Sequence, residues 1–180
     1  MTFCVTECQD CPQLVESRTQ IVNGVGPEHA EIMFVGEAPG KNEDESGEPF
    51  VGQSGTELDK ALENAGITRE QIRITNTVRC RPPDNRDPKA EERDNCFSYL
   101  QAEIEHVDPE LIIPVGKVPS EQLLQRDVAV TKEAGETDTV EYNNTTYTVL
   151  ISVHPAAMLY DRSLEDTFYS TIKQGVETVA

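Results

Sequence analysis

Residues 32–40, IMFVGEAPG, join a short apolar run to a loop bounded by two glycines. The four apolar residues before Gly36 predict a short buried strand, and the Glu-Ala-Pro-Gly sequence after it predicts a tight loop. In open α/β sheets, ligands bind beyond the carboxyl ends of the strands. We therefore expect the functional site of this chain to form around this loop.

Three further apolar runs end in the same way, each at a glycine or at a polar residue. The runs and the residues that follow them are 72–75 with Asn76, 111–115 with Gly116, and 149–153 with His154. The carboxyl ends of parallel strands meet at one edge of a sheet. The sequence therefore predicts an α/β fold that gathers a carboxylate, an amide and an imidazole at one edge.

Segments between these runs predict the surrounding elements. We expect a solvated charged loop over 41–48, a helix opened by a capping box at 54–57 and ending near 64, a helix over 90–106, a hairpin over 137–153 and a helix over 164–176. The five basic side chains between residues 79 and 93 are expected to form one locally positive face in an otherwise acidic chain.

The composition is strongly acidic. The chain has 180 residues, with 33 Asp and Glu against 15 Lys and Arg, which gives a formal net charge of -18. This length predicts one domain, and the charge resembles that of proteins from salt-accumulating halophilic archaea, where self-repulsion is screened. No apolar run reaches the ~18 residues of a membrane span and no signal-peptide pattern is present, so we expect a cytoplasmic protein without a membrane partner.

The five cysteines are unevenly spaced, with Cys4, Cys8 and Cys11 clustered at the start and Cys80 and Cys96 far from them. In a cytosolic chain, cysteines are more often metal ligands or reactive thiols than disulfides. The pattern therefore predicts a ligand set that the fold must bring together.

Two other enzyme motifs resemble parts of the sequence, but residues that each motif requires are missing. Segment 4–11 has the cysteine spacing of the radical S-adenosylmethionine motif, but Asp10 occupies the position of its aromatic residue and no strand precedes the segment. Segment 36–42 looks like a damaged phosphate loop, but Asn42 replaces the Ser or Thr that would hold magnesium. The sequence thus argues against both enzyme classes.

Several motifs occur together in the order found in one family. They are Gly36-Glu37-Ala38-Pro39-Gly40, Glu43-Asp44, Gly47-x-Pro49-Phe50-Val51-Gly52, Asn76-x3-Cys80-Arg81-Pro82-Pro83-x-Asn85-Arg86 and His154-Pro155-Ala156. Over most of its length the chain therefore resembles the family 4 uracil-DNA glycosylases, the iron-sulfur branch of that superfamily. The resemblance implies a three-layer α/β/α sandwich around a four-stranded parallel sheet. Residues 1–180 are expected to form a single, monomeric domain with an N-terminal iron-sulfur arm.

The resemblance also implies a cofactor. Cys8-x2-Cys11 and Cys80-x15-Cys96 match the family's ligand spacing, so a 4Fe-4S cluster is expected on these four cysteines, with Cys4 left over. The cluster is remote in sequence from the loops expected to hold the base, so we expect its role to be structural.

The family's positions imply how a flipped uracil would be held. Phe50 would offer its ring to the base. Asn76 would donate to uracil O4 and accept from N3-H, whereas cytosine presents the opposite pattern at both atoms.

Cleavage of the glycosidic bond places negative charge on uracil O2. His154 is expected to donate a hydrogen bond to that oxygen, together with backbone N-H groups around Glu37 and Ala38, directly after Gly36. The residue that activates the attacking water stays open among Glu37, Glu43 and Asn85. Glu43 has a second role open to it, exclusion of the thymine methyl group.

The residues expected to contact DNA are Arg81, Arg86, Leu159 and Arg162. The family usually continues its His-Pro motif with a Leu-Arg pair, whereas Tyr160 stands here where the Arg is expected. Leu159 or Met158 is expected to wedge into the base stack, and Arg162 to take over the phosphate contact.

The resemblance implies a DNA repair enzyme that flips out uracil from single- or double-stranded DNA and hydrolyses its N-glycosidic bond, leaving an abasic site. Two alternatives stay open: a glycosylase for another deaminated base, and an inactive iron-sulfur DNA-binding module. The expected Asn76 contact argues against the first alternative. The joint presence of Glu37, Asn76 and His154 argues against the second.

Overall fold

A computed structural model describes residues 1–180, and its centre is a five-stranded sheet in the order β2-β1-β3-β5-β4. The strands are β1 (Ile32–Gly36), β2 (Arg73–Asn76), β3 (Leu111–Pro114), β4 (Thr137–Tyr142) and β5 (Thr145–Leu150). Four of them run parallel, as expected, and β4 lies antiparallel to β5 at the edge. The predicted hairpin therefore extends the four-stranded parallel sheet by one antiparallel strand.

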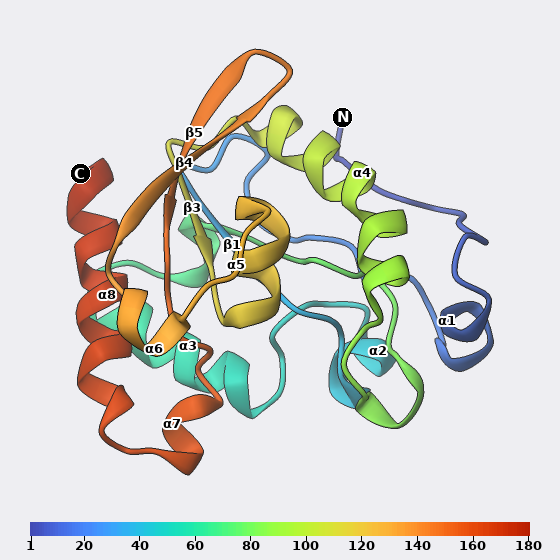
Figure 1. The fold of residues 1–180 in the computed structure, drawn as a ribbon, viewed down its shortest axis with the longest axis horizontal. Coiled ribbons are helices and arrows are strands. Elements are labelled where there is room, and N and C mark those ends of the chain that lie inside the picture. Colours follow the sequence, from blue (N-terminus) through green and yellow to red (C-terminus); the bar gives the residue numbers. More distant parts are fainter.

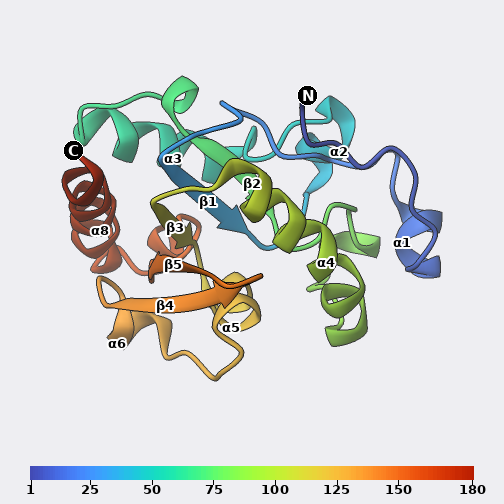
Figure 2. The ribbon, with the colours of Figure 1, turned by 90° about the horizontal axis from the view of Figure 1, so that it is seen from above.

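Helices cover both faces of the sheet (Figures 1 and 2). They are α1 (Pro12–Ser17), α2 (Lys41–Ser46), α3 (Gln53–Asn64), α4 (Ala90–Val107), α5 (Lys117–Leu124), α6 (Val130–Glu133), α7 (Ala157–Tyr160) and α8 (Leu164–Val179), with 3₁₀ turns at Arg69–Gln71 and Pro83–Asn85. α3 and α8 pack on one face, and α4 and α5 on the other. The predicted three-layer α/β/α sandwich is thus confirmed. None of the helices combines the length and the apolar character that crossing a bilayer requires.

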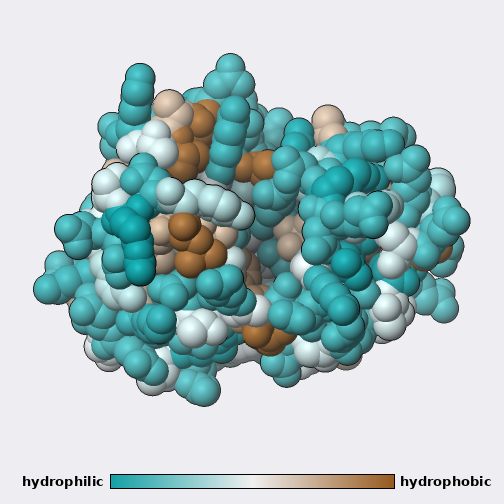
Figure 3. All heavy atoms as spheres, turned by 90° about the horizontal axis from the view of Figure 1, so that it is seen from below, coloured by the Kyte–Doolittle hydropathy of each residue, from teal (hydrophilic) through white to brown (hydrophobic).

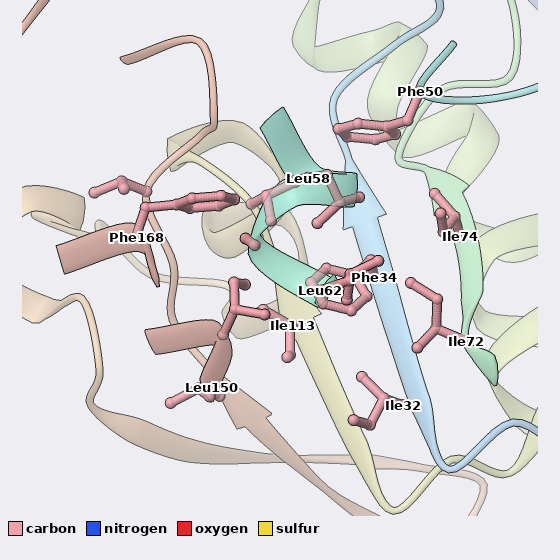
Figure 4. Close-up of a cluster of buried hydrophobic side chains, with 14 of the residues drawn as sticks. Ile32, Phe34, Phe50, Leu58, Leu62, Ile72, Ile74, Ile113, Leu150 and Phe168 are labelled. Atoms are coloured by element: carbon pink, nitrogen blue, oxygen red, sulfur yellow. The ribbon is translucent and has the colours of Figure 1, made fainter. Parts of the chain in front are cut away.

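Strand β1 is apolar on both sides because both faces of the sheet are covered. Ile32 and Phe34 join the core beneath α3 and α8, which Figure 4 shows in close-up. Met33 and Val35 point to the opposite layer, where Leu100 of α4 is among their partners. The unbroken hydrophobic run of the sequence is therefore the expected pattern for a central parallel strand.

The register of the sheet brings the carboxyl ends of its parallel strands together. Gly36 at the end of β1 pairs with Asn76 at the end of β2. Beyond β3, Val115 forms a bridge with Ser152, two residues before His154. The residues that follow the strands therefore collect at one edge, and Figure 4 shows Phe50 lying just past the tip of β1.

Two local predictions were wrong. The charged segment after Gly40 forms helix α2 instead of a loop, because the Glu43 carboxylate accepts a hydrogen bond from Gly40 N at 3.0 Å and caps the helix start. Helix α3 begins after Gly52 without any side-chain cap, so the predicted capping box at 54–57 does not form. The hydrogen bonds of Glu43 to Gly40 and Gly52, described below, fix the starts of both helices.

The predicted positive face is smaller than the sequence suggested. Arg79 is buried and pairs with Glu103 of α4. Arg86 forms an ion pair with Glu92 at 2.7 Å, and the Lys89 ammonium donates to Gln13 at 2.9 Å. Two of the five basic side chains are therefore neutralised by acids inside the chain, and the positive charge of the segment rests on the other three.

Candidate active site

A cavity of about 450 Å³ opens at the carboxyl edge of the sheet, within the range of small-molecule sites of roughly 300–1,000 Å³. It is lined by most of the predicted site residues: Glu37, Ala38, Glu43, Phe50, Asn76, Asn85, His154 and Leu159. Figure 3 views the molecule from below and shows this side hollowed between two largely hydrophilic halves, with hydrophobic patches beside the hollow. Side chains distant in sequence thus share one pocket.

Gly36 lies behind the pocket wall, at a position where there is no room for a larger side chain. A Cβ at this position would lie 2.4 Å from the Asn76 side-chain oxygen and 2.5 Å from the Phe50 ring. Neither neighbour can retreat without leaving the site. Gly36 therefore acts by letting the Phe50 ring and the Asn76 amide approach the strand closely.

The backbone of Phe50 has φ 55°, a left-handed conformation that costs a non-glycine residue about 1–3 kcal/mol. Arg69 holds it from one side, donating to the Phe50 carbonyl at 2.6 Å. Glu43 holds the next two residues, accepting from the N-H groups of Val51 and Gly52 at 3.0 and 2.9 Å. The ring is therefore fixed over the pocket before any ligand arrives.

Glu43 is committed to this scaffold. Its two carboxylate oxygens accept three backbone hydrogen bonds, from Gly40, Val51 and Gly52. These contacts tie the start of α2 to the turn that carries Phe50. These contacts leave Glu43 less free than Glu37 to accept a proton from water.

The Asn76 side chain is only 3% exposed and lines the pocket. No intramolecular hydrogen bond uses its amide. The amide lines the open pocket, so it can serve a ligand that offers both an acceptor and a donor. Sequence reasoning placed this amide correctly at the end of β2.

The imidazole of His154 is held in a defined tautomer. Its Nδ1 accepts a hydrogen bond from the N-H of Ala156 at 3.0 Å, so the proton of the neutral ring resides on Nε2. Burial lowers the pKa of His154 to about 4, which keeps the ring neutral at physiological pH. Gly116 makes room behind it, because a Cβ there would lie 3.2 Å from the His154 Cβ. His154 can therefore donate a hydrogen bond without carrying a charge.

Glu37 has a perturbed environment at the pocket floor. Burial, together with a hydrogen bond to the Asp87 carboxyl and repulsion by its charge, raises the pKa of Glu37 to about 7. Arg93 opposes the shift. A carboxyl group that titrates near neutral pH is suited to accept a proton during catalysis. Asp87 was missed by sequence reasoning, since nothing in the run Arg86-Asp87-Pro88 marks it as a partner of Glu37.

Asn85 reaches the pocket from the 3₁₀ turn after β2. Its side-chain oxygen already accepts a hydrogen bond from Arg81 Nε at 2.7 Å. The remaining NH₂ group can donate but cannot accept a proton. Arg81 thus positions Asn85 in this structure.

The other residues predicted to contact DNA differ in how far their side chains are exposed to solvent. Arg86 forms an ion pair with Glu92 and also lines a small pocket with Asn85 and His154. Met158 is buried in the core beneath α8. Leu159 lies at the pocket rim and is 43% exposed. Arg162 is largely exposed and has one loose ion pair, to Glu165 at 3.5 Å.

A second, smaller cavity is lined by all four predicted cluster ligands, Cys8, Cys11, Cys80 and Cys96. Cys4 is exposed and does not line it. The rest of the wall is mainly apolar and includes Leu14, Val15 and Val78. No group of three or more His, Cys, Asp or Glu side chains in the molecule has the arrangement that would hold a single metal ion. The arrangement therefore gathers four thiols in a protected site away from the main pocket.

Two side chains outside the cysteine set donate hydrogen bonds to the sulfurs, and such donors stabilise thiolates. Arg18 donates to Cys80 Sγ at 3.3 Å and Asn95 to Cys11 Sγ at 3.7 Å. Burial raises the pKa of Cys96 to about 11, so the thiol keeps its proton unless a cation compensates the thiolate. Neither Arg18 nor Asn95 was identified from the sequence, which gives no sign that they approach the cysteines.

Comparisons with known proteins agree with this geometry. The profile of the uracil DNA glycosylase superfamily matches residues 23–174. A type-4 uracil-DNA glycosylase of Archaeoglobus fulgidus is 38% identical over 94% of this chain and 87% of its own length. Proteins of the same name from Sulfurisphaera tokodaii and Thermotoga maritima are each 38% identical, over 94% and 89% of this chain and 79% and 82% of their own lengths.

Proposed function

Because the chain belongs to the uracil-DNA glycosylase superfamily, and to the type-4 enzymes within it, we propose that it removes uracil from DNA. The reaction is hydrolysis of the N-glycosidic bond, which leaves an abasic site. The observation that carries this proposal is the meeting of the Phe50 ring, the unpartnered Asn76 amide and the neutral His154 imidazole in one pocket.

Each group has a step in the proposed reaction. The extruded uracil stacks on Phe50, while Asn76 donates to O4 and accepts from N3-H. As the bond breaks, His154 Nε2-H donates to the developing charge on O2, as preorganised donors in an oxyanion hole do. Glu37 accepts a proton from the water that attacks the sugar. Glu43 and Asn85 are the weaker candidates for that last role, because their oxygens are already engaged.

The proposal is tested with duplexes that contain a single uracil, hypoxanthine or mismatched thymine. Each is incubated with the protein and then treated with alkali, which cuts the strand at an abasic site. We expect product from the uracil duplex only, since hypoxanthine has a second ring and thymine carries a 5-methyl group that a pocket shaped for uracil would have to accommodate. Product from hypoxanthine alone would support the runner-up, a glycosylase for another deaminated base.

We predict that Asn76→Asp lowers the preference for uracil over cytosine by about 10-fold or more. A carboxylate no longer donates to uracil O4, but it accepts from the cytosine amino group, and each mismatched polar contact costs about 1–3 kcal/mol. The measurement is the excision rate on matched uracil and cytosine substrates. Asn143→Asp, on the exposed turn of the β4–β5 hairpin, is the matched control. Equal uracil rates in Asn76→Asp and the parent would show that Asn76 does not read the base.

We predict that the excision rate rises with pH through a limb near pH 7. Glu37 is protonated below its pKa of about 7 and ready to accept a proton above it. Asp87→Asn removes one cause of the raised pKa and moves the limb to lower pH, while burial, the larger cause, keeps it above the usual value of 4.5. Glu37→Gln abolishes the limb. Asp84→Asn, on the same exposed loop, serves as control. A limb that stays at the same pH in both Glu37→Gln and Asp87→Asn would refute this role of Glu37.

We propose that Cys8, Cys11, Cys80 and Cys96 hold a 4Fe-4S cluster, which the donor set and the apolar site fit. The cluster joins the N-terminal arm to α4, and it takes no part in the chemical step.

Replacing any one of these four cysteines with serine is predicted to lose visible absorption and to lower the iron content from about four per chain. Cys4→Ser is the control and keeps both. A colourless parent that binds one zinc would contradict the assignment.

We also propose the domain organisation, the oligomeric state and the location of the protein. Residues 1–180 would act as one domain and as a monomer in the cytoplasm, on uracil in single- or double-stranded DNA. Sedimentation of the protein alone and with each kind of strand tests the monomeric state and the choice of strand.

A further inference from the structure

The exposed apolar side chains of this acidic protein gather in one place. Apart from the terminal Met1, the large apolar residues with high exposure are Val51, Leu159 and Tyr160, and Tyr160 is the extreme at 92%. Leu159 and Tyr160 line the mouth of the active-site cavity, and Val51 directly follows Phe50. Exposed apolar groups collected at one rim mark a contact surface.

Tyr160 is presented on a fixed support. It ends helix α7, and Met158 of the same helix is buried in the core beneath α8. The Asp161 N-H bonds back to the Ala157 carbonyl at 2.9 Å and closes the turn. The phenol ring makes no hydrogen bond or ring contact inside the chain. A rigid turn thus holds a free aromatic face toward solvent beside the pocket.

Charge favours an aromatic contact with DNA at this rim over an ionic one. The net charge of -18 opposes approach to phosphates at low salt, and high salt weakens phosphate contacts in any protein. Base stacking on an aromatic ring is far less sensitive to ions and tolerates every base, since each has a π face. The ligand that matches an exposed ring beside a base-sized pocket is therefore another base.

We propose that Tyr160 stacks on the nucleobase adjacent to the extruded nucleotide, an inference that rests on the proposed function. The ring takes the place of a phosphate contact and steadies the opened strand while uracil occupies the pocket. Leu159, its neighbour on the rim, fills the gap left by the base. Tyr160 is thus a positioning residue for the substrate and has no part in bond cleavage.

The test compares Tyr160→Ala, Tyr160→Phe and Tyr160→Arg for binding and excision at about 0.2 M and about 2 M KCl. We expect Tyr160→Ala to weaken DNA binding by about 5- to 150-fold at both salt concentrations, and Tyr160→Phe to change it by less than about 2-fold. In Tyr160→Arg, a new phosphate contact should steepen the fall of log affinity with log salt by about one unit. Melting curves check that each variant keeps the stability of the parent.

A second substrate makes the test specific to stacking. The base on one side or the other of the uracil is replaced by an abasic analogue, and Tyr160→Ala is compared with the parent on each strand. On the side that Tyr160 contacts, the loss caused by Tyr160→Ala should disappear. An equal loss without either neighbouring base, an equal defect in Tyr160→Phe, or no loss in Tyr160→Ala would each overturn the inference. Absence of uracil excision by the parent would instead refute the proposed function.

Discussion

Replacing His154 with alanine is expected to lower the single-turnover rate of uracil excision by about 10²–10³, the usual cost of losing one preorganised donor to a developing oxyanion. The Ala156 N-H holds Nδ1 and thereby places the proton on Nε2. The lowered pKa, about 4, keeps the ring neutral. Proton loss from a charged imidazole should therefore produce no falling limb above pH 6.5, so that only the rising limb assigned to Glu37 is seen near neutral pH.

His154→Gln is the companion variant, since its amide retains a donor and should recover part of the rate. The melting temperature and visible absorption of both variants serve as checks on folding. A rate in His154→Ala within about 10-fold of the parent would be inconsistent with a donor at uracil O2. A parent profile that falls above pH 6.5 in a manner lost in His154→Ala would show that the imidazole acts in its charged form.

Glu103→Gln is expected to lower the free energy of unfolding by about 3–5 kcal/mol. Glu103 of α4 is 0% exposed and pairs with two buried arginines, Arg73 and Arg79. Arg73 also donates to the Gly26 carbonyl at 2.9 Å, and the Arg79 guanidinium lies 5.4 Å from the centre of the Phe3 ring. Removing the carboxylate leaves two buried cations without a counter-charge and releases the N-terminal segment they hold.

Urea unfolding in constant high salt measures this effect. Glu105→Gln, two residues away on an exposed position of the same helix, changes the total charge equally and should shift stability by less than about 0.5 kcal/mol. The difference between the two variants isolates the buried pair from the general acidity of the chain. Similar unfolding midpoints for Glu103→Gln and Glu105→Gln would show that the buried ion pairs are not needed for stability.

The sequence predicted the central sheet and much of the site because both depend on local patterns. An apolar run that ends in Gly36, Asn76 or His154 can be recognised from the sequence alone. Because the strands are parallel, their carboxyl ends lie together at one edge of the sheet. The same logic failed for charged segments. Lys41–Ser46 resembles a solvated loop, yet the contacts of Glu43 and the burial of Asp44 make it a helix.

Long-range pairing accounts for what the sequence did not reveal. Arg79 resembles its exposed basic neighbours until Glu103, 24 residues further on, is seen beside it. Asp87 gains importance only through Glu37, and Arg18 only through Cys80. In each case the chemistry of a side chain depends on a partner from another element, and no spacing within the chain records that partner.

The most direct test of the account is the stoichiometry of products from a duplex with one uracil, incubated with the parent protein in about 2 M KCl, where the charge of -18 is screened. Free uracil is measured by mass spectrometry and abasic sites by alkaline cleavage. We predict equal amounts of free uracil and abasic site, with no strand break before alkali. Folded, iron-containing protein that releases no uracil at any salt concentration would contradict it.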